Sequence, residues 1–257
     1  MSALRLPAGA PGRLLALLYP RRCPFCDALL GPDAREGALC PACAAEEQRL
    51  AHQPPRLPAT EHAFYALSSA SAAYYYTGAV RRTILLCKRG AHPWYARELA
   101  DRMAVRLWGA QPAARPGERP QAALPTGIPL YHCIVPVPPH QAWPGMPGLP
   151  LLLARRLGAV LGVPVVQALR TRRSAAQKQL GRAGRMQNAK NAYACRPGTD
   201  LSGKRVLLVD DIITTGATAS ACALALLQAG ASDVTAAAIA AVEELPRQQR
   251  ITTEKHT

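Results

Sequence analysis

The segment from Val206 to Thr218 constrains the fold most strongly, because four consecutive apolar residues precede two aspartates and a loop of threonines around a glycine. A strand without polar alternation is buried on both faces, as in a parallel sheet that is covered by helices. Asp210 and Asp211 then come at the carboxyl edge of that strand, where open α/β sheets bind their ligands. The segment therefore predicts an α/β domain with a ligand site at the edge of a mostly parallel sheet.

The loop after the two acids has the composition of a phosphate-binding site. Its threonine hydroxyls and backbone N–H groups, together with the amino end of a following helix, suit a monoester phosphate. That helix is expected at 219–229, which is rich in Ala and Leu and is followed by Gly230 as a C-terminal cap. The two carboxylates can accept hydrogen bonds from vicinal hydroxyls or reach a hydrated Mg²⁺ ion. A sugar phosphate is thus the expected ligand.

This segment resembles the phosphoribosyl-pyrophosphate (PRPP) signature of type I phosphoribosyltransferases, in which Thr-Thr-Gly-(Gly/Ala)-Thr follows an apolar strand, two acids and two spacers. By this resemblance, Asp210 and Asp211 hold the ribose 2′ and 3′ hydroxyls. The residues that wrap the 5′-phosphate are Thr214, Thr215, Gly216, Ala217 and Thr218. The alternative is the acidic pair of a receiver domain or a magnesium phosphatase. Those folds place their acids after an early strand and do not require the threonine loop.

Two Cys-x-x-Cys pairs form the second informative feature: Cys23 with Cys26 and, after thirteen further residues, Cys40 with Cys43. Four thiolates in two tight turns suit a tetrahedral structural Zn²⁺ ion, which can fix a segment too short to build its own core. Two redox or disulfide pairs are the alternative. We recognise no secretion signal, and the tandem arrangement favours metal. We therefore predict a four-cysteine zinc module, similar to a zinc ribbon, in a cytoplasmic protein, and we assign no chemistry to the other cysteines.

The length of 257 residues accommodates one main α/β domain and a small metal-binding appendage. A proline-rich linker at 52–58 separates the two, so we expect the zinc module at 14–50, the phosphoribosyltransferase-like domain at 59–242 and a polar tail at 243–257. The apolar run at 14–18 is too short to span a membrane and is expected to form a short helix near the cysteines.

The rest of the main domain alternates candidate strands and helices. Strands are expected at 64–76, 134–137, 163–166 and 234–239, helices at 78–86, 93–108 and 149–161, and a long proline-rich loop at 111–129. The tyrosine cluster at 74–76 is interpreted as strand packing, with stacking on a base as the alternative.

The charge balance favours polyanionic partners, because 31 Lys and Arg residues against 16 Asp and Glu residues give a net charge of +15. PRPP is one such partner, and the surplus charge suits single-stranded DNA as a second. Seven basic residues and no acidic residue lie at 170–190. This basic segment predicts a flap whose cations close over pyrophosphate or follow a nucleic-acid backbone, with a solvated loop as the alternative.

The order of these features is similar to that of ComF-type proteins, the competence-associated phosphoribosyltransferase-like proteins of bacteria, over about 14–242. The resemblance is carried by the four cysteines, Tyr76-x-Gly78, Lys88-x-Gly90, Val-Pro-Val-Pro at 135–138, Gln177, Arg185, Asn188 and the PRPP loop. It implies a pyrophosphate-binding turn made of Lys88, Arg89 and Gly90. The catalytic residues would be Lys88, Asp210, Asp211 and Arg185. The resemblance also implies proteins of the competence machinery as partners.

One segment departs from the ComF pattern. After Val-Pro-Val-Pro, the family has an Arg-Gly-Phe-Asn-Gln-like segment, whereas this chain has Met146, Pro147, Gly148, Leu149 and Pro150. Loss of the Arg and Asn side chains would weaken turnover while the PRPP loop stays intact. Three functions follow: a phosphoribosyltransferase with an unidentified acceptor, a non-catalytic PRPP-responsive factor that binds single-stranded DNA, or a zinc-bearing scaffold. The last requires a vestigial PRPP loop, and the completeness of that loop opposes it.

Overall fold

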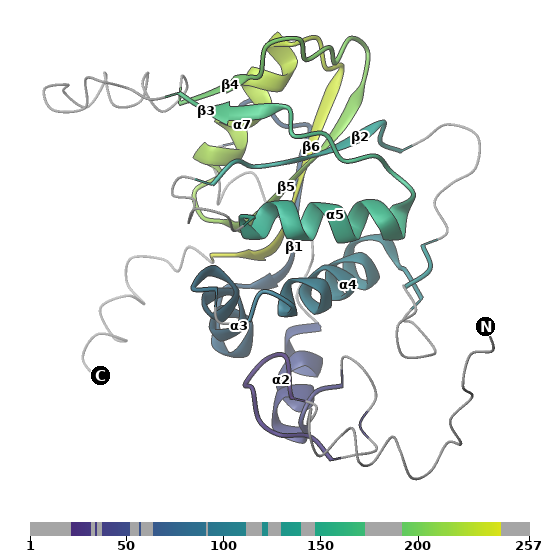
Figure 1. Cartoon of the computed structure of the whole chain (residues 1–257), viewed down its shortest axis with the longest axis vertical. Helices are drawn as coiled ribbons and strands as arrows, with labels where there is room; N and C mark the ends of the chain where they lie inside the picture. Colours follow the sequence, from purple (N-terminus) through teal and green to yellow (C-terminus); the bar gives the residue numbers. More distant parts are fainter. Residues whose placement is uncertain are drawn as a thin grey trace, which may run out of the picture.

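The computed structural model describes residues 22–31, 34, 38–51, 57, 64–90, 92–111, 120–122, 130–139, 147–172 and 192–242. Its centre is a four-stranded, all-parallel sheet in the order β1-β6-β5-β2 (Figure 1). The strands are β1 (Ser69–Tyr75), β2 (Cys133–Pro136), β5 (Arg205–Ile213) and β6 (Asp233–Ala241). The predicted α/β fold class, a mostly parallel sheet with flanking helices, is confirmed.

The apolar run at the start of β5 is buried on both faces of the sheet. Val206 and Leu208 belong to one hydrophobic core, while Leu207 and Val209 belong to the other. Because successive strand residues point to opposite faces, an uninterrupted apolar run is what such a central strand requires. The short side chains of β6, which reads DVTAAAIAA, divide between the same two cores.

Helices cover both faces of the sheet (Figure 1). Buried residues of α3, α4 and α5 share one core, which includes Ile84, Leu99 and Leu153, and α7 contributes Leu226 to the other. The bounds are α2 (Pro41–Ala51), α3 (Gly78–Lys88), α4 (Tyr95–Trp108), α5 (Leu149–Leu161) and α7 (Ala217–Gln228). Helix α2 belongs to the cysteine-rich end and was not predicted from the sequence.

Two predictions for the main domain need correction. The segment 163–166 is not a strand: Val165 makes a single parallel bridge to Ile134, and Pro164 has no N–H with which to extend a ladder. A two-stranded antiparallel ribbon, β3 (Leu169–Thr171) with β4 (Tyr193–Cys195), was missed. Its two strands lie on either side of 173–191, which contains most of the basic segment and is outside the described residues.

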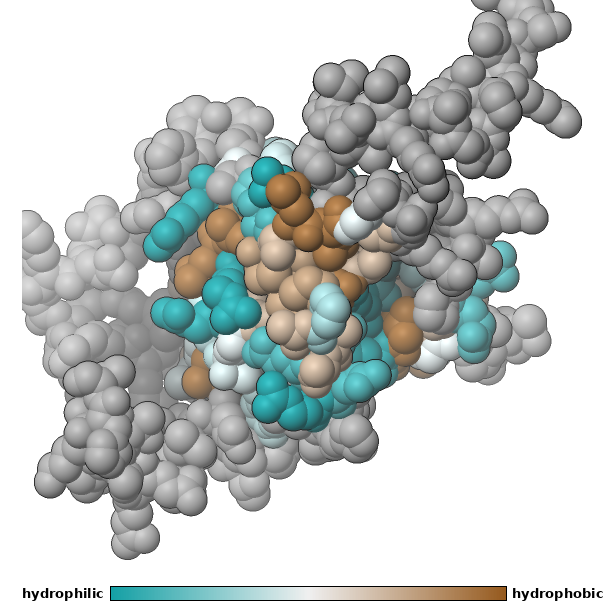
Figure 2. Space-filling model, turned by 90° about the horizontal axis from the view of Figure 1, so that it is seen from below, coloured by the Kyte–Doolittle hydropathy of each residue, from teal (hydrophilic) through white to brown (hydrophobic). Residues whose placement is uncertain are grey.

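The cysteine-rich end lies at the bottom of Figure 1, below α3 and α4. Seen from below in Figure 2, apolar residues gather in a central area bordered by hydrophilic ones. Among the exposed apolar residues, Leu29 is 62% exposed. The helix expected at 14–18 and the tail expected at 243–257 lie outside the described residues, as does most of the loop expected at 111–129. Within the described part of the chain, no helix is long and apolar enough to cross a membrane.

Candidate functional site

The two aspartates lie where β5 runs past its shorter neighbour. Pairing of β2 with β5 ends at Pro136 and Val209, and the Val137 N–H then donates to the Val209 carbonyl over 2.9 Å. On its other side β5 continues along β6 to Ile213. The acids are therefore inside β5 rather than after it, but they lie beyond the end of β2, at the edge where α/β sheets bind ligands.

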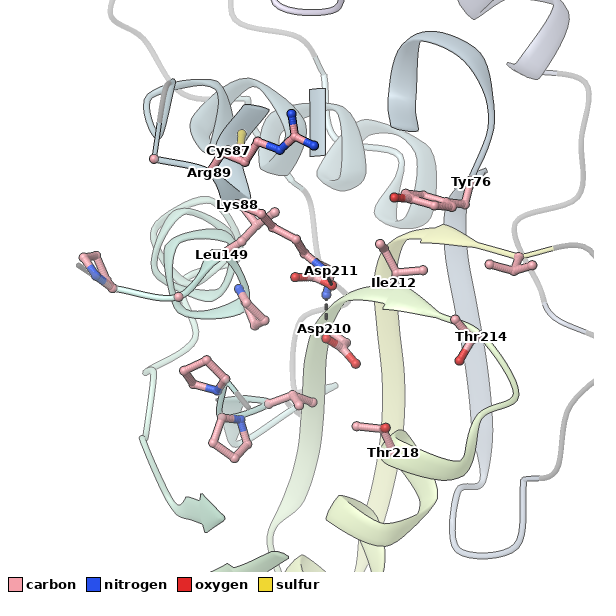
Figure 3. A pocket seen from close by; sticks show the side chains of 18 residues that line it. Tyr76, Cys87, Lys88, Arg89, Leu149, Asp210, Asp211, Ile212, Thr214 and Thr218 are labelled. Carbon is pink, nitrogen blue, oxygen red and sulfur yellow. Dashed lines mark hydrogen bonds and ion pairs between the residues drawn. The ribbon is translucent and has the colours of Figure 1, made fainter. Parts of the chain in front are cut away.

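A cavity of about 720 Å³ opens at this edge, within the size range of small-molecule sites. Figure 3 shows Lys88 reaching from the end of α3 toward Asp211, with Asp210 next to it and Thr218 on the far side. We call the charged and hydroxyl-bearing side of the cavity the polar half. It consists of Lys88, Arg89, Asp210, Asp211, Thr214 and Thr218. Two segments that are distant in sequence, 88–89 and 210–218, thus meet in one pocket.

An ion pair connects two sides of the polar half. Lys88 Nζ lies 2.8 Å from Asp211 Oδ1, with 40% of the lysine side chain exposed and 11% of the aspartate side chain. Lys88 is the last residue of α3, where the helix dipole favours a cation. The Asp211 N–H donates to Asp210 Oδ1 over 2.7 Å. The pocket therefore places one cation against two adjacent carboxylates.

Burial makes both carboxylates harder to ionise. The pKa of Asp210 is raised to about 7, first by desolvation and then by the neighbouring Asp211 charge. Desolvation also raises the pKa of Asp211, although the nearby Lys88 ammonium opposes the shift. The pKa of the Cys87 thiol in the same wall is raised to about 12 by burial and by Asp211, so this thiol is neutral near pH 7. A divalent cation or ribose hydroxyls would favour the ionised carboxylates.

The threonine loop ends at the amino terminus of α7. Gly216 is the N-cap of α7 with φ +78°, and a Cβ on it would lie 2.5 Å from the Phe64 ring. Only glycine fits both conditions. Thr214 and Thr218 line the cavity, whereas Thr215, Gly216 and Ala217 shape the loop and are not part of the cavity wall. Thr215 Oγ1 accepts a hydrogen bond from the Ala217 N–H over 3.4 Å.

The uncharged part of the cavity wall, which we call the apolar half, contains the segment that departs from the ComF pattern. It consists of Val137, Pro138, Pro139, Pro147, Gly148, Leu149 and Pro150. A Cβ on Gly148 would lie 3.3 Å from the Pro139 ring, so the two proline-containing segments are in close contact. None of these residues carries a charge. Met146, which completes the departing segment, lies outside the described residues.

Among the lining residues that were not predicted from the sequence as site residues, three lie near strand ends. Tyr76 follows β1, Ile212 lies near the end of β5, and Val242 follows β6, and all three line the cavity. Tyr74, in contrast, is buried against Phe25 as strand packing predicts. The position of Tyr76, Ile212 and Val242 in the sequence could have identified them, because each lies near the carboxyl end of a parallel strand. The Tyr76 ring also lies 5.9 Å from the Arg81 guanidinium.

The four cysteines of the predicted zinc module come together. Their Sγ atoms all lie within 4.8 Å of one another, and Cys26 and Cys40 are 3.6 Å apart. A tetrahedral zinc ion with Zn–S bonds of about 2.3 Å separates its sulfurs by about 3.8 Å. Cys23 and Cys43 are buried. The cluster therefore fits a structural zinc ion.

The basic segment contributes nothing to the described site. Arg185, together with Gln177 and Asn188, lies outside the residues whose structure is described, so its predicted place in a flap stays a prediction.

Comparison with protein families agrees with this geometry. Residues 148–254 match the phosphoribosyl transferase domain, and residues 14–55 match the double zinc ribbon domain. The chain therefore carries a phosphoribosyltransferase-like domain. A zinc ribbon precedes it, in accord with the clustered cysteines. No curated protein matches the chain.

Two solved structures illustrate how distant the similar structures are. A glutamine PRPP amidotransferase from B. subtilis, complexed with ADP and GMP, is 22% identical, with a TM-score of 0.34, over 55% of this chain and 25% of that chain. A purine phosphoribosyltransferase from Pyrococcus horikoshii Ot3 is 21% identical, with a TM-score of 0.30, over 46% of this chain and 67% of that chain. This chain thus spans about a quarter of the amidotransferase.

Proposed function

We propose that this chain is a ComF-type protein that binds PRPP with Mg²⁺ in the described pocket and transfers the phosphoribosyl group to an unidentified acceptor, with release of pyrophosphate. The observation that carries the proposal is the meeting of the Lys88 turn, the Asp210 and Asp211 pair and the threonine loop in one cavity. The PRPP signature and the ComF resemblance together require these groups at one place. A role in DNA uptake belongs to the same proposal.

Each part of the polar half has a proposed role. The threonine loop and the amino end of α7 would hold the 5′-phosphate, because backbone N–H groups and the helix dipole both favour an anion there. Asp210 and Asp211 would accept hydrogen bonds from the ribose hydroxyls. Lys88 and Arg89 would face the pyrophosphate, and Mg²⁺ would add positive charge there. Oxygen ligands suit that ion.

Catalysis by such a site would consist of positioning and charge stabilisation. A nitrogen nucleophile attacks ribose C1 as pyrophosphate leaves, and the transition state resembles an oxocarbenium ion. Negative charge develops on the leaving group, so a fixed cation such as Lys88 lowers the barrier by several kcal/mol in sites of this kind. Arg185 is proposed to add a second cation when the flap closes.

The first test is calorimetric titration of the zinc-loaded protein with PRPP and Mg²⁺. Asp211→Asn should raise the Kd for PRPP roughly ten-fold or more, because hydrogen bonds to a charged acceptor contribute about 1.5–3 kcal/mol. Asp233→Asn is the matched control, since Asp233 lies at the start of β6, at the opposite edge of the sheet. It should leave the Kd unchanged. An unchanged Kd for Asp211→Asn contradicts the proposed site.

The second candidate is a non-catalytic, PRPP-responsive competence factor that binds single-stranded DNA. Two observations favour it: the uncharged apolar half of the pocket and the net charge of +15. Retention of single-stranded DNA at low salt that falls steeply as salt increases would support this candidate. No retention at low salt would oppose it. Both candidate functions share two further proposals. The protein is cytoplasmic, and its zinc module, main domain and tail span 14–50, 59–242 and 243–257.

A further inference from the structure

The zinc module contacts α3 at its first turn. Glu46, from α2, accepts a hydrogen bond at Oε1 from the Ala79 N–H over 3.0 Å. The first N–H groups of a helix have no partner within it, and the N-cap Thr77 makes no side-chain hydrogen bond to α3. Gly78, with φ +48°, allows this approach, because a Cβ there would clash with the Glu46 carboxylate. Glu46 Oε2 also lies 3.8 Å from Arg82 Nη2.

A hydrogen bond connects the middle of α3 to the first Cys-x-x-Cys turn. Thr83 is completely buried, and its Oγ1 lies 2.9 Å from the Pro24 carbonyl oxygen and 3.0 Å from the Ala79 carbonyl of its own helix. Pro24 lies between Cys23 and Cys26. A backbone group of the metal-binding turn therefore fixes the position of the helix.

The chain that leaves α3 is held by the residue after Cys26. Asp27 Oδ1 accepts a hydrogen bond from Tyr95 Oη over 2.6 Å, and its Oδ2 lies 3.7 Å from His92 Nε2. His92 follows the Lys88–Gly90 turn closely, and its N–H donates to the Leu86 carbonyl over 3.4 Å. The zinc module thus contacts the first turn of α3, its middle and the segment that follows it. Lys88 lies at the end of this helix.

We propose that the zinc-bound module positions the Lys88–Gly90 turn and thereby sets the affinity of the pocket for PRPP. Glu46, Thr83 and Asp27 act as positioning residues, since none of them lines the cavity. A tetrahedral zinc site fixes its backbone turns, so the groups that hold α3 are fixed with it. If the turn is already ordered in the free protein, less conformational entropy is lost when the ligand binds. The identity of the ligand rests on the proposed function, whereas the coupling rests on the contacts alone.

Two adjacent glutamates of α2 provide a matched test. Glu46 reaches α3, whereas Glu47 Oε1 accepts hydrogen bonds from Tyr74 Oη in β1 over 2.7 Å and Arg102 Nε in α4 over 2.9 Å. With zinc content verified, Glu46→Ala should raise the Kd for PRPP and Mg²⁺ roughly five-fold or more. Glu47→Ala should lower the Tm but keep the Kd within about two-fold. Glu46→Gln keeps an acceptor oxygen and should restore binding.

Equal effects of Glu46→Ala and Glu47→Ala on the Kd would overturn the inference, because both remove contacts of the same module. Hydrogen exchange of the full chain gives a readout that needs no PRPP. Chelation of zinc should accelerate amide exchange at 84–90 more than at 206–209 in β5, and equal protection in α3 with and without zinc would also overturn the coupling. If the wild-type protein fails to bind PRPP, the proposed function fails, and the exchange result still decides the coupling.

Discussion

The polar and apolar halves of the pocket come from different kinds of structure. The polar half takes Lys88 from the end of α3, Asp210 and Asp211 from β5 and Thr218 from the start of α7, and only Arg89 and Thr214 lie just outside these regular elements. The apolar half comes from the segment after β2 and the first residues of α5. Regular elements hold side chains more precisely than connecting segments do. The polar half is therefore the part of the pocket best suited to hold a highly charged ligand in one position.

The difference between the two halves assigns PRPP binding to the polar half and the expected loss of turnover to the apolar half. Among the described residues that line the cavity, every charged side chain lies in the polar half. Where the ComF resemblance expects Arg and Asn, the apolar half presents Pro147, Leu149 and Pro150. We expect PRPP affinity to depend on the polar half and to be nearly insensitive to the apolar half. Three variants or conditions test this division, and we order them by their expected effect on PRPP affinity.

The largest effect is expected from Gly216→Val in the polar half. The new side chain would occupy a left-handed backbone conformation and collide with the Phe64 ring, so the threonine loop must rearrange. We expect no saturable PRPP binding in calorimetry and a free energy of unfolding lowered by roughly 1–3 kcal/mol in urea denaturation.

Gly198→Val is the control for backbone strain. Gly198 has φ +76°, close to that of Gly216, but no heavy atom lies within 4 Å of a Cβ built there. This variant should lose stability and still bind PRPP within about two-fold of the wild type. Similar losses of affinity in both variants would show that general strain, rather than the loop itself, controls binding.

A change of pH should have the next largest effect. The Asp210 carboxyl, with its pKa raised to about 7, must be ionised to accept hydrogen bonds from ribose hydroxyls. Lowering the pH from about 8 to about 6 should therefore raise the Kd for PRPP roughly ten-fold. Asp210→Asn should bind weakly with a flatter pH profile, which separates this carboxyl from the titration of PRPP itself. Identical slopes for the variant and the wild type would contradict the assignment.

Stability should respond to pH in the opposite direction. The folded-state pKa of Asp210 lies above the ordinary value of 3.8, so the folded protein binds this proton more tightly than the unfolded chain does. The contribution of this carboxyl to stability is greatest below pH 3.8 and is lost as the pH rises through about 7. Binding thus improves over the pH range in which this group becomes a cost to folding, as expected for a functional site.

The part of the polar half that β5 and the threonine loop supply could be predicted from the sequence because it is short and contiguous. The strand, the acids and the threonine loop occupy 206–218, and the uniform apolar run distinguishes a central parallel strand from an edge strand. The meeting of Lys88 with Asp211 could be expected only through a family resemblance. No local pattern relates two residues so distant in the chain.

The missed features depend on contacts between distant segments. The ribbon of β3 and β4 has strands of three residues, too short for a period to appear, and its pairing joins Leu169 to Cys195. Likewise, the apolar segment 163–166 has the composition of a strand. Pro164 lacks an N–H group, and the segment forms only one bridge, between Val165 and Ile134. The contact of Glu46 with the start of α3 depends on how the zinc module docks, which spacing within the module does not determine.

The smallest effect on affinity is expected from Leu149→Ala in the apolar half. Leu149 is 5% exposed and belongs to the core shared with α4, so its truncation should lower the free energy of unfolding by about 3 kcal/mol. The Kd for PRPP should stay within about two-fold of the wild type. Leu153→Ala is the control, because Leu153 is fully buried one turn later in α5 and does not line the cavity.

Comparison of the two leucine variants decides what the apolar half does. Equal losses of stability with unchanged affinity would show that the departing segment serves packing and leaves PRPP to the polar half. A loss of affinity confined to Leu149→Ala would mean that PRPP contacts the apolar half, and the separation of binding from turnover would then be wrong. Because both substitutions remove the same atoms from one helix, a difference in affinity between them must come from the cavity wall itself.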